Sequence, residues 1–151
     1  MQDLLLIILG FLLGLVPGWW ARRSRLKVHW GALLAEIIIC SEKAKTYLED
    51  SVMAPLYRLP AKAYEASLPV LLSDAALKVD DVRALLLYYG QVEDFNRGLD
   101  NAAALAMENN TGMLKTEYKR NCIKAQQLVA PIDGSKNLFV EARSSIQCHL
   151  E

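Results

Sequence analysis

The residues of this chain considered first for chemistry are three cysteines, two histidines and the acidic residues Asp80, Asp81, Glu93 and Asp94. Cys40, Cys122 and Cys148 lack C-x-x-C spacing and are scattered relative to His29 and His149, which argues against a zinc site. Cys148 and His149 are neighbours, and adjacent side chains on a helix point in different directions, so they do not form a nucleophile–base pair. We therefore expect free thiols, no bound metal and no cofactor.

The acidic pairs Asp80–Asp81 and Glu93–Asp94 fall on a segment with helical periodicity, whose outer face needs charged residues. Arg97 follows the second pair at helical spacing, so surface ion pairs explain this group better than acid–base catalysis. The sequence also contains no G-x-x-x-x-G-K, G-x-G-x-x-G or G-x-S-x-G motif. Because no catalytic constellation is present, we predict that the protein is not an enzyme.

Two asparagines and six tyrosines are further polar side chains whose placement matters. Asn96 and Asn121 fall on the apolar stripes of their segments, where a buried amide sets the pairing register of helices because it must find a partner. The tyrosines could line a cavity for a lipid or another small ligand, which leaves a ligand-binding bundle as an alternative function. They are Tyr47, Tyr57, Tyr64, Tyr88, Tyr89 and Tyr118.

The elements that must position these residues are bounded by composition. The chain has 151 residues, of which 53% are hydrophobic and 23% are charged, with 17 basic and 17 acidic side chains. This length favours a single domain, and the composition excludes a disordered chain and a disulfide-stabilised scaffold. A net charge near zero gives no reason to expect binding to nucleic acid.

An uncharged stretch near the start predicts a membrane anchor. Residues 4–20 read LLLIILGFLLGLVPGWW, and a helix of this length measures about 25 Å, close to the ~30 Å hydrocarbon core of a bilayer. Trp19 and Trp20 end the stretch, as indoles do at the boundary between lipid and water. No positive charge precedes it and a poor cleavage site follows it, so a retained transmembrane anchor over 1–21 is favoured over a signal peptide.

Basic residues gather directly after this stretch, whereas none precedes it. They are Arg22, Arg23, Arg25 and Lys27. The positive-inside rule then places this flank and the rest of the chain in the cytoplasm, with a very short N-terminus outside the cell membrane. The remainder of the chain carries a small acidic excess, so positive charge is concentrated where anionic lipid headgroups would lie.

Three glycines predict a contact within the membrane. Gly10, Gly14 and Gly18 are four residues apart and share one face of the expected helix. Small residues on such a face let two helix backbones approach closely. We expect this face to contact a second copy of the chain or another membrane protein.

Heptad spacing of apolar residues predicts helices in the rest of the chain. Between residues 22 and 50, apolar residues recur at alternating steps of four and three, which indicates a basic juxtamembrane segment that continues as an amphipathic helix. Residues 51–60 contain two prolines and are expected to form a linker, and 61–151 a helical bundle. Within that bundle, Pro69 is expected to end or kink a short helix, and Asp80 to cap the strongest one. Residues 109–112, which read NNTG, are expected to form a turn and helix cap.

Together these features predict an all-α protein with one N-terminal transmembrane helix and a cytosolic bundle of heptad-spaced helices. Such an architecture is shared by many unrelated proteins and transfers no function by itself. The anchor, the glycine face and the wide apolar stripes favour a membrane-anchored interaction protein. We expect a scaffold, accessory subunit or regulator that contacts membrane lipid and a protein partner, or a second copy of itself.

Overall fold

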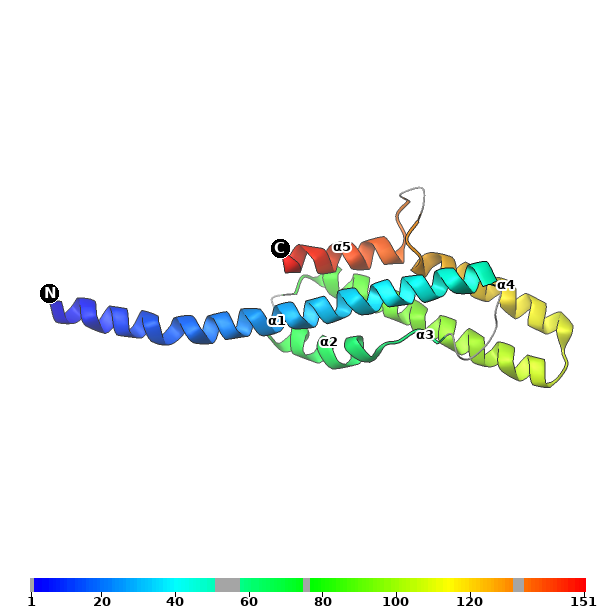
Figure 1. The fold of residues 1–151 in the computed structure, drawn as a ribbon, viewed down its shortest axis with the longest axis horizontal. Helices are drawn as coiled ribbons and strands as arrows, with labels where there is room; N and C mark the ends of the chain where they lie inside the picture. Colours follow the sequence, from blue (N-terminus) through cyan, green and yellow to red (C-terminus); the bar gives the residue numbers. More distant parts are fainter. Residues whose placement is uncertain (1, 51–57, 75–76, 132–134) are drawn as a thin grey trace.

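The computed structural model describes the backbone of residues 2–50, 58–74, 77–131 and 135–151, and the side chains of these segments from residue 17 onward except residue 50. Within these ranges the protein is all-helical, as predicted (Figure 1). Most of the expected linker, residues 51–57, lies outside the described residues. The helices are α1 (Gln2–Asp50), α2 (Lys62–Asp74), α3 (Val79–Met107), α4 (Thr111–Leu128) and α5 (Leu138–Leu150).

Helix α1 is the longest element and runs without a break through the boundary expected near residue 21. Its 49 residues correspond to a rod of about 74 Å, and Pro17 lies inside it. The N-terminal part of this rod projects beyond the other four helices, which pack along its second half (Figure 1). Among the residues with described side chains, which omit most of 4–20, no helix has a stretch long and apolar enough to cross a membrane.

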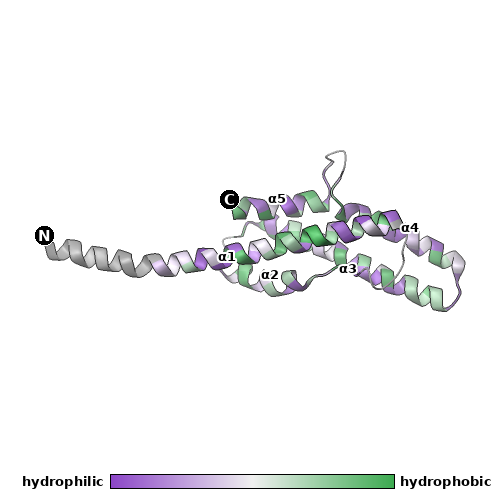
Figure 2. Ribbon diagram, in the orientation of Figure 1, coloured by the Kyte–Doolittle hydropathy of each residue, from purple (hydrophilic) through white to green (hydrophobic). Residues whose placement is uncertain are grey.

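The apolar stripe expected on α1 forms one wall of the core, where Leu33, Ile37 and Tyr47 are fully buried. The stripe packs against α4 and α5 and contacts Tyr88 and Phe95 of α3, and this confirms the helical bundle. Figure 2 shows hydrophobic residues along the part of α1 that runs through this body. The α3 side of the core includes Leu85, Tyr88, Tyr89, Val92, Phe95 and Leu99.

Helices α3 and α4 form an antiparallel hairpin, side by side in Figure 1. Asn109 adopts a positive φ of 54° at the turn, a conformation that asparagine tolerates better than most residues. The side chain of Asn110 caps α4 by accepting a hydrogen bond from the backbone N–H of Met113. The turn expected at 109–112 is therefore confirmed.

One expected helix cap was wrong, and a proline that was expected to end or kink a helix does not end it. The N-cap of α3 is Lys78 rather than Asp80, because Asp81 at the third helical position accepts the backbone N–H of Lys78 at 3.3 Å. Pro69 lies inside α2 and does not end it. Proline has no N–H, so Pro69 cannot donate a helical hydrogen bond to the carbonyl of Glu65. Pro69 and Glu65 are both exposed, so water can bind to that carbonyl instead.

Candidate functional site on the polar face of α1

Four polar residues of α1 repeat at intervals of seven and all bond to residues 58–74. Seven residues make close to two helical turns, so these side chains lie along one line on α1. We call this line the polar seam: it consists of Arg22, His29, Glu36 and Lys43. Sequence reasoning missed it, although its signal was present as a heptad repeat of polar residues beside the apolar stripe.

As the polar seam runs forward along α1, its partners run backward along the sequence from residue 74 to residue 58. The guanidinium of Arg22 donates to the carbonyl of Asp74 at 2.7 Å, and the His29 ring is hydrogen-bonded to the Ser67 hydroxyl at 3.0 Å. The ammonium of Lys43 donates to the carbonyl of Arg58 at 3.2 Å. Hydrogen bonds to backbone and side chains thus hold α2 in antiparallel register on α1.

Glu36 is the buried centre of the polar seam, with 6% of its surface exposed. One carboxylate oxygen accepts the backbone N–H of Ala63 at 2.8 Å. The other accepts the N–H of Tyr64 and the hydroxyl of Tyr89, both at 3.0 Å. Because the first N–H groups of a helix have no partner within it, Glu36 serves as the cap of α2 from a different helix, where its negative charge also suits the helix dipole.

The surroundings of Glu36 keep neighbouring groups in their neutral forms. Burial, followed by the negative charge of Glu36 and its hydrogen bond, raises the pKa of Tyr89 well above its usual value, so this hydroxyl remains a donor. The Tyr64 ring stacks on that of Tyr89, with ring centroids 4.0 Å apart. Burial also raises the pKa of the Cys40 thiol to about 12, with a further contribution from Glu36, and the Cys40 thiol is therefore unreactive.

The basic residues that follow the apolar stretch are mostly bonded within the protein. Arg25 pairs with the Asp74 carboxylate at 2.9 Å, beside the bond from Arg22 to the Asp74 carbonyl. Lys27 donates to the carbonyl of Leu150 at 2.8 Å. These partners lie at the C-terminal ends of α2 and α5, where free carbonyls and the helix dipole favour positive charge. We call this region, around Arg22, Arg23, Arg25 and Lys27, the basic end.

Beside the basic end, Asp81 joins α3 to α5. Its carboxylate accepts the Ser145 hydroxyl at 2.7 Å and His149 Nε2 at 2.9 Å. An ionised carboxylate only accepts hydrogen bonds, so Nε2 carries the proton. The His149 ring also stacks on Trp30 with centroids 4.4 Å apart and planes 4° from parallel.

This Ser–Asp–His cluster is not arranged for nucleophilic catalysis. In a hydrolase triad the histidine lies between serine and aspartate and takes the serine proton, whereas here Asp81 lies between Ser145 and His149. Burial raises the pKa of Asp81, but hydrogen bonds from Ser145 and His149 and the positive charge of His149 outweigh this effect and hold it below the usual value. The cluster can join helices but has no base to activate the serine.

The two asparagines expected to set register have different partners. Asn96 accepts the backbone N–H of Leu59 at 2.8 Å and donates to the carbonyl of Leu59 at 3.0 Å, so it fixes the chain just before α2. Asn121 is fully buried against Gly98, where an added Cβ would overlap its amide. The Asn121 amide and the Tyr47 hydroxyl have no hydrogen-bond partner among the described protein atoms.

The membrane residues expected from the sequence are described only in part. Gly10 and Gly14 belong to the portion of α1 whose side chains lie outside the described residues. A Cβ placed on Gly18 would meet nothing within 4 Å. Trp19 and Trp20 are 62% and 71% exposed. These indoles therefore project away from the body.

The other chemical candidates are dispersed. Across residues 17–49, 58–74, 77–131 and 135–151, no three His, Cys, Asp or Glu side chains are placed to hold a metal ion. All three cysteines are free, and Cys148 is exposed. Tyr47, Tyr88 and Tyr89 pack in the core, whereas Tyr57 lies outside the described residues. Tyr64 and Tyr118 are partly buried and pack against this core.

Two apolar hollows open on the surface of the body. One, of about 640 Å³, lies where α1 meets the end of α4 and the start of α5, and includes Leu48, Val129 and Phe139. The other, of about 520 Å³, lies between the end of α2 and the start of α3, and includes Leu72, Leu77, Val79, Val82, Leu86 and Leu87. Each is large enough to receive side chains of a partner or a small ligand.

Comparison with protein-family models, with characterised proteins and with solved structures found no match to this chain. Its function must therefore be argued from its own geometry.

Proposed function

We propose that this protein is a single-pass membrane protein whose residues 1–21 form the anchor and whose helical body binds a protein partner at the cytoplasmic face of the cell membrane. The observation that carries the proposal is the continuity of α1. One helix joins the uncharged stretch to the body without a break, and its N-terminal part projects beyond the other helices (Figure 1). That part can enter a bilayer without any change in the packing of the body.

The contacts at the basic end support a body held close to the membrane surface. Arg22 and Arg25 fasten the end of α2, and Lys27 fastens the end of α5, within two turns of Trp20. A flexible linker between anchor and body is therefore unnecessary. Such rigid coupling suits a scaffold or accessory subunit, which must present a surface at a fixed height above the bilayer.

The exposed apolar surface between α2 and α3 supports a protein partner. Leu72, Val79 and Leu86 are 53%, 83% and 51% exposed, and they surround the hollow of about 520 Å³. Contiguous exposed apolar patches are uncommon on proteins that act alone and mark contact sites. The same surface shows no catalytic group, which favours binding over chemistry.

Membrane fractionation tests the anchor. The full chain should remain in the membrane pellet after extraction with alkaline carbonate. Leu12→Arg should shift it towards the supernatant, because an arginine at the centre of a membrane helix costs about 2.5–3.5 kcal/mol. The matched control is Val28→Arg, which adds the same charge at a residue that is already 68% exposed. A wild-type chain that is found in the supernatant would remove the anchor from the proposal.

Cysteine labelling tests the orientation. Cys148 is exposed, so a membrane-impermeant maleimide should modify it after lysis but not in intact cells. Cys148→Ser removes that signal, and Gln2→Cys should be labelled in intact cells from the other side. Labelling of Cys148 in intact cells would place the body outside the cytoplasm.

Site-specific crosslinking tests the partner. A photoreactive benzoyl-phenylalanine at Leu87, which is 45% exposed in the hollow between α2 and α3, should yield a crosslinked species of discrete mass in native membranes. The same residue at Met113, which is 60% exposed at the far end of the hairpin, is the matched control. A purely monomeric protein that gives the same result at both positions would contradict a partner at this surface.

A second candidate function is the binding of a small apolar ligand by the body. The hollow of about 640 Å³ beside Phe139 falls within the size range of ligand pockets. A fluorescent apolar dye should then bind with one-site stoichiometry and be weakened by Val129→Trp, which fills the hollow. Dye binding that is unaffected by this variant would remove the candidate.

A further inference from the structure

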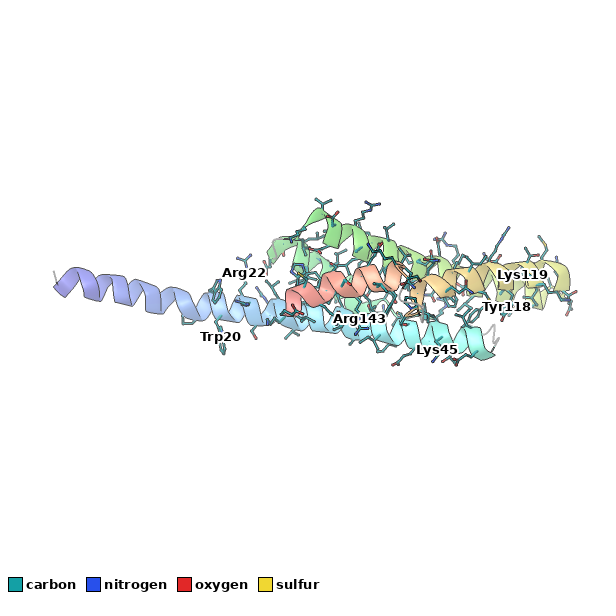
Figure 3. The ribbon with its side chains drawn as sticks, turned by 90° about the horizontal axis from the view of Figure 1, so that it is seen from above. Trp20, Arg22, Lys45, Tyr118, Lys119 and Arg143 are labelled. Atoms are coloured by element: carbon teal, nitrogen blue, oxygen red, sulfur yellow. The ribbon has the colours of Figure 1, made fainter. Side chains whose placement is uncertain are left out.

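The basic end of α1 has two faces with different roles. Figure 3 shows Trp20 and Arg22 pointing to opposite sides of the helix, as expected for residues two apart. Arg25 lies one turn after Arg22, and both bond to Asp74. The opposite face follows Trp20 at helical spacing. Positive charge is thus divided between one face that is bonded to α2 and another, called here the open face, on which Lys27 bonds to the end of α5 and Arg23 lies over Trp19.

The open face forms a shallow hollow of about 410 Å³. Its lining residues are Trp20, Arg23, Ser24, Lys27 and Val28, so it combines two cations and a hydroxyl with apolar flanks and no acidic side chain. The Arg23 guanidinium lies over the Trp19 ring, 5.5 Å from its centre. A cation–π contact of this kind favours one position of the guanidinium and does not use up its N–H donors, which can bind oxygen.

We propose that this face binds the phosphate group of an anionic phospholipid. The inference rests on the membrane anchor proposed above. Arginine recognises phosphate oxygens through paired N–H donors, and the Ser24 hydroxyl can donate a further hydrogen bond. Lys27, whose ammonium bonds to the Leu150 carbonyl, adds positive charge at the edge of the site.

The spacing along α1 places the polar groups at the depth of lipid headgroups. With Trp20 at the boundary of the hydrocarbon, Arg23 and Ser24 lie about 4.5–6 Å further along the helix axis. The headgroup layer of each leaflet is roughly 5–8 Å thick, so these two residues fall within it. The apolar side of Trp20 matches the glycerol and acyl portions of a lipid, which a free phosphate ion lacks.

Fluorescence quenching in reconstituted membranes tests the proposal. The full chain is incorporated into phosphatidylcholine vesicles that contain brominated phosphatidylglycerol or brominated phosphatidylcholine, which quench nearby indoles. A Trp30→Phe background removes the buried indole and leaves Trp19 and Trp20 as reporters. The ratio of the two quenching constants measures the preference for the anionic lipid. This ratio should exceed one and fall by about fivefold in Arg23→Gln, the factor expected for one basic residue at an anionic surface.

Arg25→Gln is the matched control, because it removes the same charge two residues away on the bonded face. It should leave the ratio near the wild-type value. An equal loss in both variants, or in neither, would overturn the site in favour of diffuse attraction or none. Millimolar glycerol phosphate should not reverse the quenching, and complete reversal would assign the site to soluble phosphate. A chain that fails to enter the vesicles would instead overturn the anchor itself.

Discussion

Glu36 and Asp81 are two carboxylates with the same task in different surroundings. Each accepts three hydrogen bonds, and each joins the N-terminal turn of one helix to other helices. Glu36 is buried and its donors are two backbone N–H groups and a tyrosine whose pKa is raised. Asp81 is partly exposed, and its donors are a backbone N–H, a serine hydroxyl and the ring of His149.

This contrast separates a carboxylate whose donors stay protonated from one whose lowered pKa makes its contribution to stability depend on pH in acid. The donors of Glu36 keep their protons at any physiological pH, so the start of α2 is held under all such conditions. The joint at Asp81 depends on ionisation of the carboxylate and stands next to the Trp30–His149 stack at the basic end.

Loss of Glu36 should be the most damaging change. Glu36→Ala leaves the buried N–H groups of Ala63 and Tyr64 and the Tyr89 hydroxyl without their acceptor, which should lower the free energy of unfolding by about 3 kcal/mol. Urea unfolding of the full chain in detergent micelles, followed by circular dichroism, measures the loss. The control Glu42→Ala, at an exposed position of the same helix, should change it by less than about 0.5 kcal/mol.

An alanine at Gly98 tests the packing around Asn121, a buried polar side chain that, unlike Glu36, has no hydrogen-bond partner among the described protein atoms. Its Cβ would overlap the Asn121 amide, so Gly98→Ala should destabilise the body by about 1–3 kcal/mol. Gly90→Ala provides a matched control, since its Cβ meets nothing within 4 Å and helix propensity should then add up to about 1 kcal/mol. Thermal unfolding separates the two, and equal shifts would show that the Gly98–Asn121 contact is not restrictive.

The contribution of Asp81 to the stability of the body should depend on pH in the acid range. Because its pKa is lowered in the folded protein, the stability that its ionised form contributes is present above the unfolded-state value of 3.8 and is lost as pH falls through the folded value. Asp81→Asn should therefore cost about 1–2 kcal/mol at pH 7 and progressively less below pH 4. Urea unfolding at pH 7 and pH 3 measures this; an equal cost at both values would mean that ionisation of Asp81 does not matter.

The sequence predicted the elements that depend on local patterns. The apolar stripe of α1, the turn at Asn109 and the cap at Asn110 are correct because each arises from residues within a few turns of one another. The joints at Glu36 and Asp81 depend on partners 27 to 68 residues away, and no local pattern identifies those partners. The heptad spacing of polar residues marks Glu36 as part of a line on α1, but not what that line contacts.

The proposed anchor and lipid site depend on patterns of the same local kind, and their geometry was predictable only in part. The sequence grouped the four basic residues as one lipid-facing cluster. The structure divides them. Arg22 and Arg25 bond to Asp74, which is 52 and 49 residues away in the sequence, whereas Arg23 lies over the ring of Trp19. Helical spacing alone could separate the two faces, but only the position of α2 shows which of them is occupied.

The smallest effect is expected at the bonded face of the basic end. The Arg25 and Asp74 side chains are 61% and 27% exposed, so their ion pair is screened by solvent and Arg25→Gln should lower stability by at most about 0.5 kcal/mol. The loss should shrink further at 1 M salt, where the screening length is about 3 Å. Thermal unfolding at low and high salt measures it. A loss as large as that of Glu36→Ala would mean that the exposed end of α2, rather than its buried start, holds this helix on α1.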